Sequence, residues 1–334
     1  MAEGRSGASA EVEPIRRADP YDREVMREDV LEGLSLSPKE LSPKYFYDTR
    51  GSELFEDITR LDEYYLTRRE RALLERWIPT WVEELEPAAL VELGAGSAEK
   101  SRIVLDAMAA TGTAALYVPV DVSGEFLHET ARRLRGEYEG LRIAPAVADI
   151  TEGLDLGLDL PEPAWTALLG STIGNFAHAA ALRLLTRISR RMRPSDRFLM
   201  GADLRPGPRK SVERLERAYN DPQGITAAFN LNVLHVLNRE LGSDFDADAF
   251  RHRAFYVAED GRIEMHLVSR FDQTVSFPEG GDVHLAEGES IRTELSCKYD
   301  RPTIDGLFAG AGLAVERWVQ DEDEFFALAL ARRA

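Results

Sequence analysis

The sequence predicts an α/β fold: a doubly wound parallel sheet that ends in an antiparallel hairpin, with a second, α+β domain inserted into it. Apolar strand-like runs alternate with amphipathic helical patterns over residues 90–204, which is typical of a parallel sheet covered by helices on both faces. Two further strand-like runs, 314–319 and 325–330, flank the acidic segment 320–324. The segment 208–298 interrupts this order with helical and then strand-like runs of its own.

Each element is predicted from its hydrophobic period. The five expected strands of the sheet are 90–93, 116–122, 143–147, 166–169 and 198–204. The helices expected in the same domain are 98–110, 124–138, 177–192 and 303–310. In the insertion we expect helices at 212–219 and 225–241, then strands at 254–257, 262–271, 274–277 and 290–296. Asp260-Gly261 signals a hairpin turn there.

This order predicts two domains and a tail. We expect residues 1–20 to be a disordered tail, because they are polar and of mixed charge. Residues 21–67 and 208–298 are expected to form a substrate-binding domain. Residues 68–207 and 299–334 are expected to form the domain that contains the parallel sheet.

Composition excludes several classes of protein. With 334 residues and 44% hydrophobic side chains, the chain can bury a sizeable core. A formal net charge of −18 argues against nucleic acid as a partner, because duplex binding needs clustered lysine and arginine. Cys297 is the single cysteine, so no internal disulfide forms and a reducing compartment is expected. No run suits a membrane span or a signal-peptide core, so we expect a cytoplasmic protein without a membrane partner.

The Gly94-Ala95-Gly96 turn follows an apolar strand and precedes a helical pattern. Glycine lets a ligand approach the backbone closely, and a helix start offers free N–H groups, so such a turn can cradle a nucleotide. A dinucleotide fingerprint would have a third glycine where Glu99 stands. That departure and the closing hairpin favour S-adenosylmethionine (AdoMet) over a nicotinamide cofactor. The alternative is an ordinary turn between a strand and a helix.

Three charged residues lie beside this turn in the predicted sheet. Asp121 ends the second strand, where a carboxylate can accept hydrogen bonds from both ribose hydroxyls. Asp149 follows the third strand, where it can accept the adenine amino group. Lys100 lies near a helix start, where its charge opposes the helix dipole, and it can pair with the carboxylate of AdoMet. The structural alternatives are helix caps for the two aspartates and a solvated surface position for Lys100.

Further polar and aromatic residues lie outside these strand ends. In the turn 170–175, Asn175 can accept a hydrogen bond from a substrate amine, or it can cap a helix. The segments 45–48 and 63–65 are dense in tyrosine. Glu294 and Ser296 are two residues apart on a predicted strand, so they share a face and together can bind a ring that carries hydrogen-bond donors. The alternatives are core packing for the tyrosines and solvent exposure for Glu294.

Together these residues resemble the histidine Nα-methyltransferases of ergothioneine biosynthesis, from about residue 31 to the C-terminus. That family joins an AdoMet methyltransferase domain to an inserted substrate domain, which is the layout predicted above. A chance match to all of the shared motifs is implausible. They are residues 43–48 (PKYFYD), 51–55 (GSELF), 58–61 (ITRL), 63–65 (EYY), 91–94 (VELG), 169–175 (LGSTIGN), 226–230 (TAAFN) and 293–298 (TELSCK).

The resemblance implies a role for each candidate residue. The residues expected to contact AdoMet are Gly94, Lys100, Asp121, Asp149, Gly170 and Ile150, the last in place of an aromatic residue in the relatives. For histidine, the resemblance implies that Tyr64 and Tyr219 hold the carboxylate and that Asn175 holds the α-amine. It also implies that Glu294 and Ser296 bind the imidazole, with Met265 against the ring and Tyr47 close by through water.

The implied reaction moves three methyl groups in succession from AdoMet to the α-amino nitrogen of L-histidine, giving hercynine and S-adenosylhomocysteine. Asn175 and Tyr47 are the candidate catalytic residues, Tyr47 as a proton relay, and no metal is expected. We expect a monomer that acts on a small molecule. The alternatives are a methyltransferase for another aromatic amino acid such as a tryptophan derivative, a non-catalytic AdoMet-binding protein, and a nicotinamide oxidoreductase.

Overall fold

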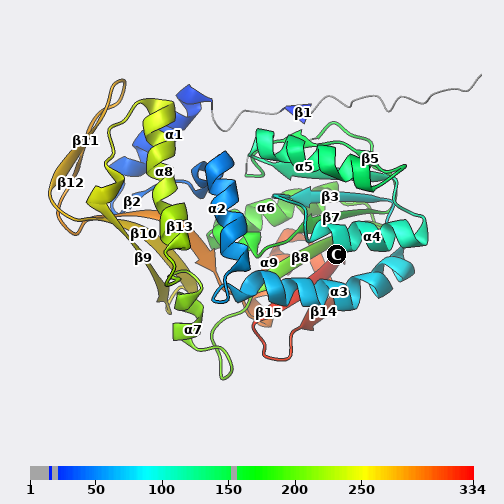
Figure 1. Ribbon diagram of the computed structural model, residues 1–334. Helices are drawn as coiled ribbons and strands as arrows, with labels where there is room; N and C mark the ends of the chain where they lie inside the picture. The colour runs from blue at the N-terminus through cyan, green and yellow to red at the C-terminus, as the bar shows by residue number, and fades with distance from the viewer. Residues whose placement is uncertain (1–14, 17–21, 152–155) are drawn as a thin grey trace, which may run out of the picture.

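The predicted parallel sheet is present and ends in the predicted hairpin (Figure 1). The computed structural model describes residues 15–16, 22–151 and 156–334. The strands of the main sheet follow the order β1-β6-β4-β3-β7-β8-β15-β14, and β5 pairs with β4. Most of the expected tail lies outside the described residues, but β1 (Ile15–Arg16) pairs with β6 in parallel.

Apart from α3, which was not predicted, the strands and helices of this domain lie within a few residues of their predicted positions. The parallel strands are β3 (Ala89–Leu93), β4 (Leu116–Asp121), β5 (Arg142–Ile143), β6 (Ala146–Val147), β7 (Ala164–Leu168) and β8 (Arg197–Asp203). The helices are α3 (Tyr65–Leu85), α4 (Ser101–Thr111), α5 (Gly124–Glu137), α6 (His178–Arg191) and α9 (Arg301–Ala311). The single strand predicted at 143–147 was wrong: it is divided into β5 and β6 at Pro145, which has no N–H to donate to a ladder.

The closing hairpin was predicted correctly. Its strands are β14 (Leu313–Gln320) and β15 (Phe326–Arg333), and β15 lies antiparallel between β8 and β14. Strand order reverses between β3 and β7. From β3 the chain adds β4 and β6 on one side, and it then returns to add β7 and β8 on the other side. In open α/β sheets, ligands bind at such a reversal, outside the carboxyl ends of the strands.

Both faces of the sheet are buried, as the continuous apolar strands predicted. Leu90 and Tyr117 belong to the core on the side of α3, α4 and α5. Their neighbours Val91 and Val118 belong to the core on the side of α6 and α9. This alternation follows from the two-residue period of a strand, and it leaves the strand ends as the part of the sheet open to a ligand.

The insertion and the N-terminal segment share a second sheet, of order β2-β13-β10-β9. Its strands are β2 (Lys39–Glu40), β9 (Phe250–Val257), β10 (Arg262–Ser269) and β13 (Ser290–Cys297). Lys39 pairs with Ile291 in parallel, so the two distant segments join edge to edge. The helices and turns around it are α1 (Arg23–Ser35), η1 (Pro43–Phe46), α2 (Thr49–Arg60), α7 (Val212–Arg217), α8 (Ile225–Leu241) and η3 (Ala247–Ala249).

A separate hairpin in the insertion was only half predicted. β11 (Gln273–Phe277) lies close to the expected 274–277, but its partner β12 (Gly281–Leu285) was missed. Asp282 and His284 of β12 are exposed, so the strand has little apolar pattern to detect. The predicted turn at Asp260-Gly261 does join β9 and β10.

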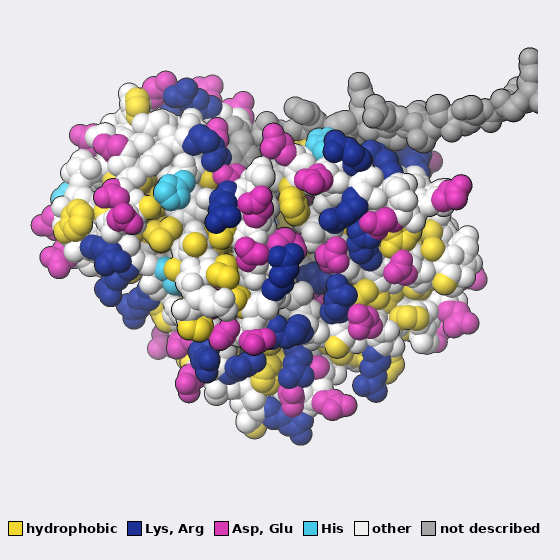
Figure 2. Space-filling model, in the orientation of Figure 1, with side chains coloured by type: hydrophobic (Ala, Val, Ile, Leu, Met, Phe, Trp, Pro, Cys, Tyr) yellow, Lys and Arg dark blue, Asp and Glu magenta, His cyan; other side chains and the backbone are white. Residues whose placement is uncertain are grey.

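On the face of the molecule drawn in Figure 2, acidic and basic side chains are intermixed rather than gathered into patches of one sign. Among the helices of the described residues, none combines the length and apolar character needed to cross a membrane.

Candidate functional site

The glycine turn after β3 forms the first part of the site. Gly94 and Gly96 have φ angles of +74° and +51°, in the left-handed region that suits glycine. A Cβ added at Gly96 would meet no atom within 4 Å, so the turn borders open space. The helix expected to begin at residue 98 begins at Ser101 instead, because Ala98 has a φ of +58°, which a right-handed helix does not allow.

Asp121 ends β4 beside this turn, where the sequence placed it. Its Oδ2 accepts a hydrogen bond from Gly96 N at 2.9 Å, and its Oδ1 accepts one from Ser123 N at 3.0 Å. Burial raises the pKa of Asp121, and these backbone donors oppose the rise. A carboxylate offers about four acceptor positions, so each oxygen keeps one for the hydroxyl groups of a ligand.

Asp149 and Ile150 lie at the adjacent strand end, after β6. Thr151 donates to Asp149 Oδ1 from its backbone N at 2.8 Å and from its Oγ1 at 2.6 Å. Lys44 Nζ lies 3.7 Å from Asp149 Oδ2. Asp149 therefore does stabilise its own turn, and Oδ2 is the oxygen with room for a further donor. Ile150 is buried in the core on the side of α6 and α9.

The turn after β7 brings the main sheet against the insertion. Gly170 has a φ of +75°, and the 3₁₀ turn η2 (Thr172–Asn175) follows. A Cβ added at Gly174 would lie 2.9 Å from Cys297 O and 3.6 Å from Ser296 Oγ. Glycine therefore allows η2 to pack directly on β13, and the half-buried Asn175 is held near the strand that carries Ser296.

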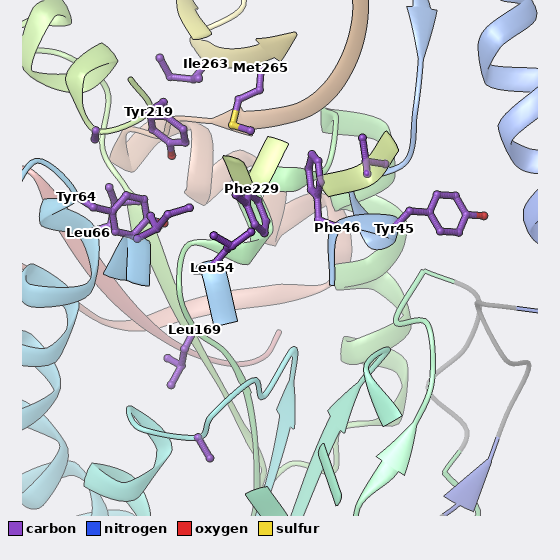
Figure 3. Close-up of a cluster of buried hydrophobic side chains, with 14 of the residues drawn as sticks. Tyr45, Phe46, Leu54, Tyr64, Leu66, Leu169, Tyr219, Phe229, Ile263 and Met265 are labelled. Carbon is purple, nitrogen blue, oxygen red and sulfur yellow. The ribbon is translucent and has the colours of Figure 1, made fainter. Parts of the chain in front are cut away.

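Aromatic side chains of the N-terminal segment and the insertion surround one space (Figure 3). The ring centroids of Tyr64 and Tyr219 are 6.3 Å apart, and those of Tyr47 and Phe229 are 5.6 Å apart. Burial raises the pKa of Tyr47, Tyr64 and Tyr219 well above the usual range, and the charge of Glu294 raises each further. These three hydroxyls therefore stay protonated at neutral pH, and all lie near Glu294.

Two tyrosines of the same clusters have other roles. Tyr45 points away from this space (Figure 3) and donates to Asp29 Oδ2 at 2.7 Å. Tyr65 donates to the buried Asp203 at 3.0 Å. These two tyrosines therefore have the structural role that was the alternative to substrate binding.

Glu294 and Ser296 of β13 lie directly opposite Met265 and Ile263 of β10. Met265 is 2% exposed, and its sulfur points toward the space beside Tyr219 (Figure 3). Burial raises the pKa of Glu294 to about 7, and Lys298 partly opposes this rise. Within the described part of the chain, no group donates a hydrogen bond to the Glu294 carboxylate. A bound ligand with an N–H group could supply that donor.

A match to a known protein family decides between the functions considered for this site. The family model of the histidine-specific, S-adenosylmethionine-dependent methyltransferases matches residues 26–333. The chain belongs to this family. The nicotinamide oxidoreductase alternative is thereby set aside, and the predicted enzyme class is confirmed.

Individual relatives of this methyltransferase span most of its length. A histidine N-alpha-methyltransferase from Mycobacterium tuberculosis is 42% identical over 319 residues, which cover 92% of this chain and 95% of the relative. An ergothioneine biosynthesis protein 1 from Neurospora crassa is 30% identical over 84% of this chain and 32% of its own length. An L-tryptophan methyltransferase from Psilocybe serbica is 28% identical over 91% of this chain and 92% of its own.

Solved structures of AdoMet-dependent methyltransferases are also similar to this chain. One from Clostridium acetobutylicum is 12% identical, with a TM-score of 0.47, over 84% of this chain and 98% of that one. Magnesium protoporphyrin IX methyltransferase from Synechocystis is 10% identical, with a TM-score of 0.46, over 87% of this chain and 98% of that one.

The candidate site also contains a buried acid that sequence reasoning missed. Glu70 of α3 accepts hydrogen bonds from Lys100 Nζ at 2.8 Å and from Gly170 N at 2.8 Å. It thereby ties together the turns after β3 and β7. Glu70 lies four residues after Leu66 and four before Leu74, both buried. Its place on the apolar face of the helix was the available signal, but no helix was predicted over these residues.

Gly201→Ala is expected to test how tightly Glu70 is packed. A Cβ at Gly201 of β8 would lie 2.0 Å from Glu70 Oε1, so the alanine variant is expected to lose about 1–3 kcal/mol of unfolding free energy through overpacking. Denaturant unfolding would measure this loss. The same change in a Glu70→Ala background has no carboxylate to displace, so its cost there should be smaller. Equal costs in both backgrounds would show that Glu70 does not fill this space.

Proposed function

We propose that this enzyme transfers three methyl groups in succession from AdoMet to the α-amino nitrogen of L-histidine, giving hercynine in ergothioneine biosynthesis. One observation carries the choice of substrate. The half-buried Glu294 carboxylate lies near three protonated tyrosine hydroxyls and accepts no hydrogen bond from the described residues. An imidazole N–H can meet that need, whereas a purely apolar side chain would leave the carboxylate unpaired.

The strand ends of the main sheet fit AdoMet. The open space beside Gly96 and the free acceptor positions of Asp121 suit a ribose. Asp149 Oδ2 would accept the adenine amino group, with Ile150 on the adenine ring. Lys100 gives one of its three N–H groups to Glu70, so two are left for the carboxylate of AdoMet. Gly94 and Gly170 would let the ligand approach the backbone closely.

The insertion and the N-terminal segment would hold histidine against these strand ends. Tyr64 and Tyr219 stay protonated, so both can donate to the α-carboxylate. Asn175, beside β13, would accept from the α-amine. Glu294 and Ser296 would bind the imidazole, and the opposing Met265 would lie against the ring.

Positioning is the main contribution expected of these residues. AdoMet, when bound, supplies a methyl group already activated by a sulfonium, so the transfer needs no metal. Holding the amine nitrogen in line with that methyl group can supply about 7–11 kcal/mol. The amine must lose a proton before each transfer. The raised pKa of Tyr47 means that its hydroxyl would relay this proton to water while remaining protonated itself.

The proposed reaction is tested by mass spectrometry. The enzyme is incubated with AdoMet and, separately, with histidine, tryptophan, tyrosine and phenylalanine. We expect histidine alone to give efficient conversion to a product heavier by three methyl groups, with mono- and dimethylated forms at early times. Preferential methylation of tryptophan would instead support the function named for the relative from Psilocybe serbica. No methylation of any amino acid would contradict both.

A further inference from the structure

Three buried charges lie behind the proposed histidine site. Asp203, at the end of β8, pairs with Lys298 through Oδ2 at 2.9 Å and with Lys210 through Oδ1 at 2.5 Å. The side chains of all three are at most 1% exposed. Two cations share one anion here, and the other acids nearby are Glu294, on the Lys298 side, and Asp321, on the Lys210 side. A buried cation is costly unless nearby anions compensate its charge.

Lys298 connects this cluster to the wall of the site. Its Nζ donates to Tyr219 OH at 2.8 Å and to Ser296 Oγ at 2.8 Å, in addition to Asp203. An ammonium group has three N–H donors and no acceptor. All three donors are therefore used, and two of them go to residues that face the proposed substrate.

The direction of these hydrogen bonds fixes what the two hydroxyls can do. Tyr219 OH and Ser296 Oγ must both accept from Lys298, so each keeps its own hydrogen for the other or for a ligand. The two oxygens are 2.8 Å apart. A hydroxyl that accepts from a cation becomes a stronger donor, because hydrogen bonds in a chain polarise one another. Tyr219 is thus prepared to donate to an anion.

Lys210 provides the contrast within the same cluster. Its other hydrogen bonds go to the backbone oxygens of Leu204 and Phe325, at 2.5 and 3.3 Å. It neutralises Asp203 without touching Tyr219 or Ser296 in any described contact. Burial lowers the pKa of Lys210 to about 8, and the charge of Asp203 opposes this fall.

We propose that Lys298, held in place by Asp203, is a positioning residue for the substrate carboxylate and acts on it through Tyr219. The Lys298 ammonium attracts the carboxylate, and its hydrogen bond leaves the Tyr219 hydroxyl as a donor toward it. This inference rests on the proposed function, and it extends the binding site to a lysine that does not touch the substrate.

The test compares Lys298→Met with Lys210→Met, using histidine and histidinol as ligands. Histidinol keeps the imidazole and the amine but has a hydroxymethyl group in place of the carboxylate. Calorimetry is done on the full chain with S-adenosylhomocysteine bound. For Lys298→Met we expect a loss of histidine affinity on the order of 10- to 100-fold, at least several times the loss for histidinol. Lys210→Met should change both affinities by the same factor.

Equal losses for the two ligands in Lys298→Met would overturn the proposal, because they would show a general structural role. If that variant does not fold, Lys298→Gln is used instead, because glutamine keeps two N–H donors without the charge. Its affinity for histidine should again fall more than its affinity for histidinol, by a smaller factor than in Lys298→Met. A wild-type enzyme that binds neither ligand would overturn the proposed function and this inference together. One that binds both ligands equally would overturn this inference alone.

The pH profile gives a second readout. Lys298 lowers the pKa of Glu294 against the larger effect of burial. The acidic groups that face the cluster are Asp203, Glu294 and, on the Lys210 side, Asp321. Without Lys298, the low-pH limb of kcat/KM for histidine should move to higher pH, whereas Lys210→Met should leave it in place. An unmoved limb in Lys298→Met would contradict the proposed proximity of this charge to the imidazole end of the site.

Discussion

Glu294→Ala is expected to lower kcat/KM for histidine on the order of 100-fold or more, and to affect an apolar aromatic amino acid such as phenylalanine far less. The carboxylate accepts no hydrogen bond from the described residues, so an imidazole N–H is its expected partner. Removing it leaves that N–H unpaired inside the site. Steady-state methylation of both amino acids measures the difference, and equal losses would refute a role for Glu294 in substrate choice.

Glu294→Gln separates binding from stability. Burial raises the pKa of Glu294 from 4.5 to about 7, so between these values the folded state holds a proton that the unfolded state has lost. The free energy of unfolding therefore falls as pH rises through this window, and the ionised group costs up to about 3 kcal/mol above it. Glutamine removes this cost. We expect a higher melting temperature than wild type at pH 8, little difference at pH 4, and weakened use of histidine.

Glu294→Gln is informative because its expected effects on stability and on activity have opposite signs. A residue retained only for packing would lose stability and activity together when replaced. If Glu294→Gln lowered the melting temperature at pH 8, the ionised carboxylate would have a stabilising partner in the free enzyme. Histidine would then not be needed as the partner of this carboxylate.

Most of the main sheet could be predicted because each strand is a continuous apolar run bounded by a turn. The predicted element boundaries that were wrong depend on single backbone features. Pro145 divides one strand by removing a donor, and the left-handed φ of Ala98 delays α4 by three residues. Neither changes the hydrophobic period, so a period-based prediction does not detect them.

The candidate site was predictable where a residue lies at a strand end, as Asp121 does, or two residues from a partner on one strand, as Glu294 and Ser296 do. Glu70 and Lys298 were missed for a different reason. Both are charged residues whose partners lie far along the chain, at Gly170 and Asp203. Such residues look solvated in a sequence, and only the packing of distant segments against each other shows that they are buried.

Asp121→Ala is expected to raise the Kd for AdoMet on the order of 100-fold. The change removes the hydrogen-bond acceptor proposed for the ribose, and it also removes the acceptor that holds the backbone of the glycine turn. Asp121 Oδ2 accepts from Gly96 N at 2.9 Å. Without it, the turn that borders the open space loses its fixed geometry. Calorimetric titration of the free enzyme with AdoMet measures the effect, and an unchanged Kd would rule out this position for the ribose.

Asp121→Asn is the matched control. Asparagine keeps one oxygen to accept from Gly96 N, but it loses the charge and half of the acceptors that a ribose would use. Because burial raises the pKa of Asp121, the ionised aspartate destabilises the free enzyme above the pKa of the unfolded chain. The asparagine variant should therefore melt no lower than wild type at pH 8, yet bind AdoMet more weakly. A variant that melts lower and binds AdoMet normally would show that Asp121 serves the fold of the turn and not the cofactor.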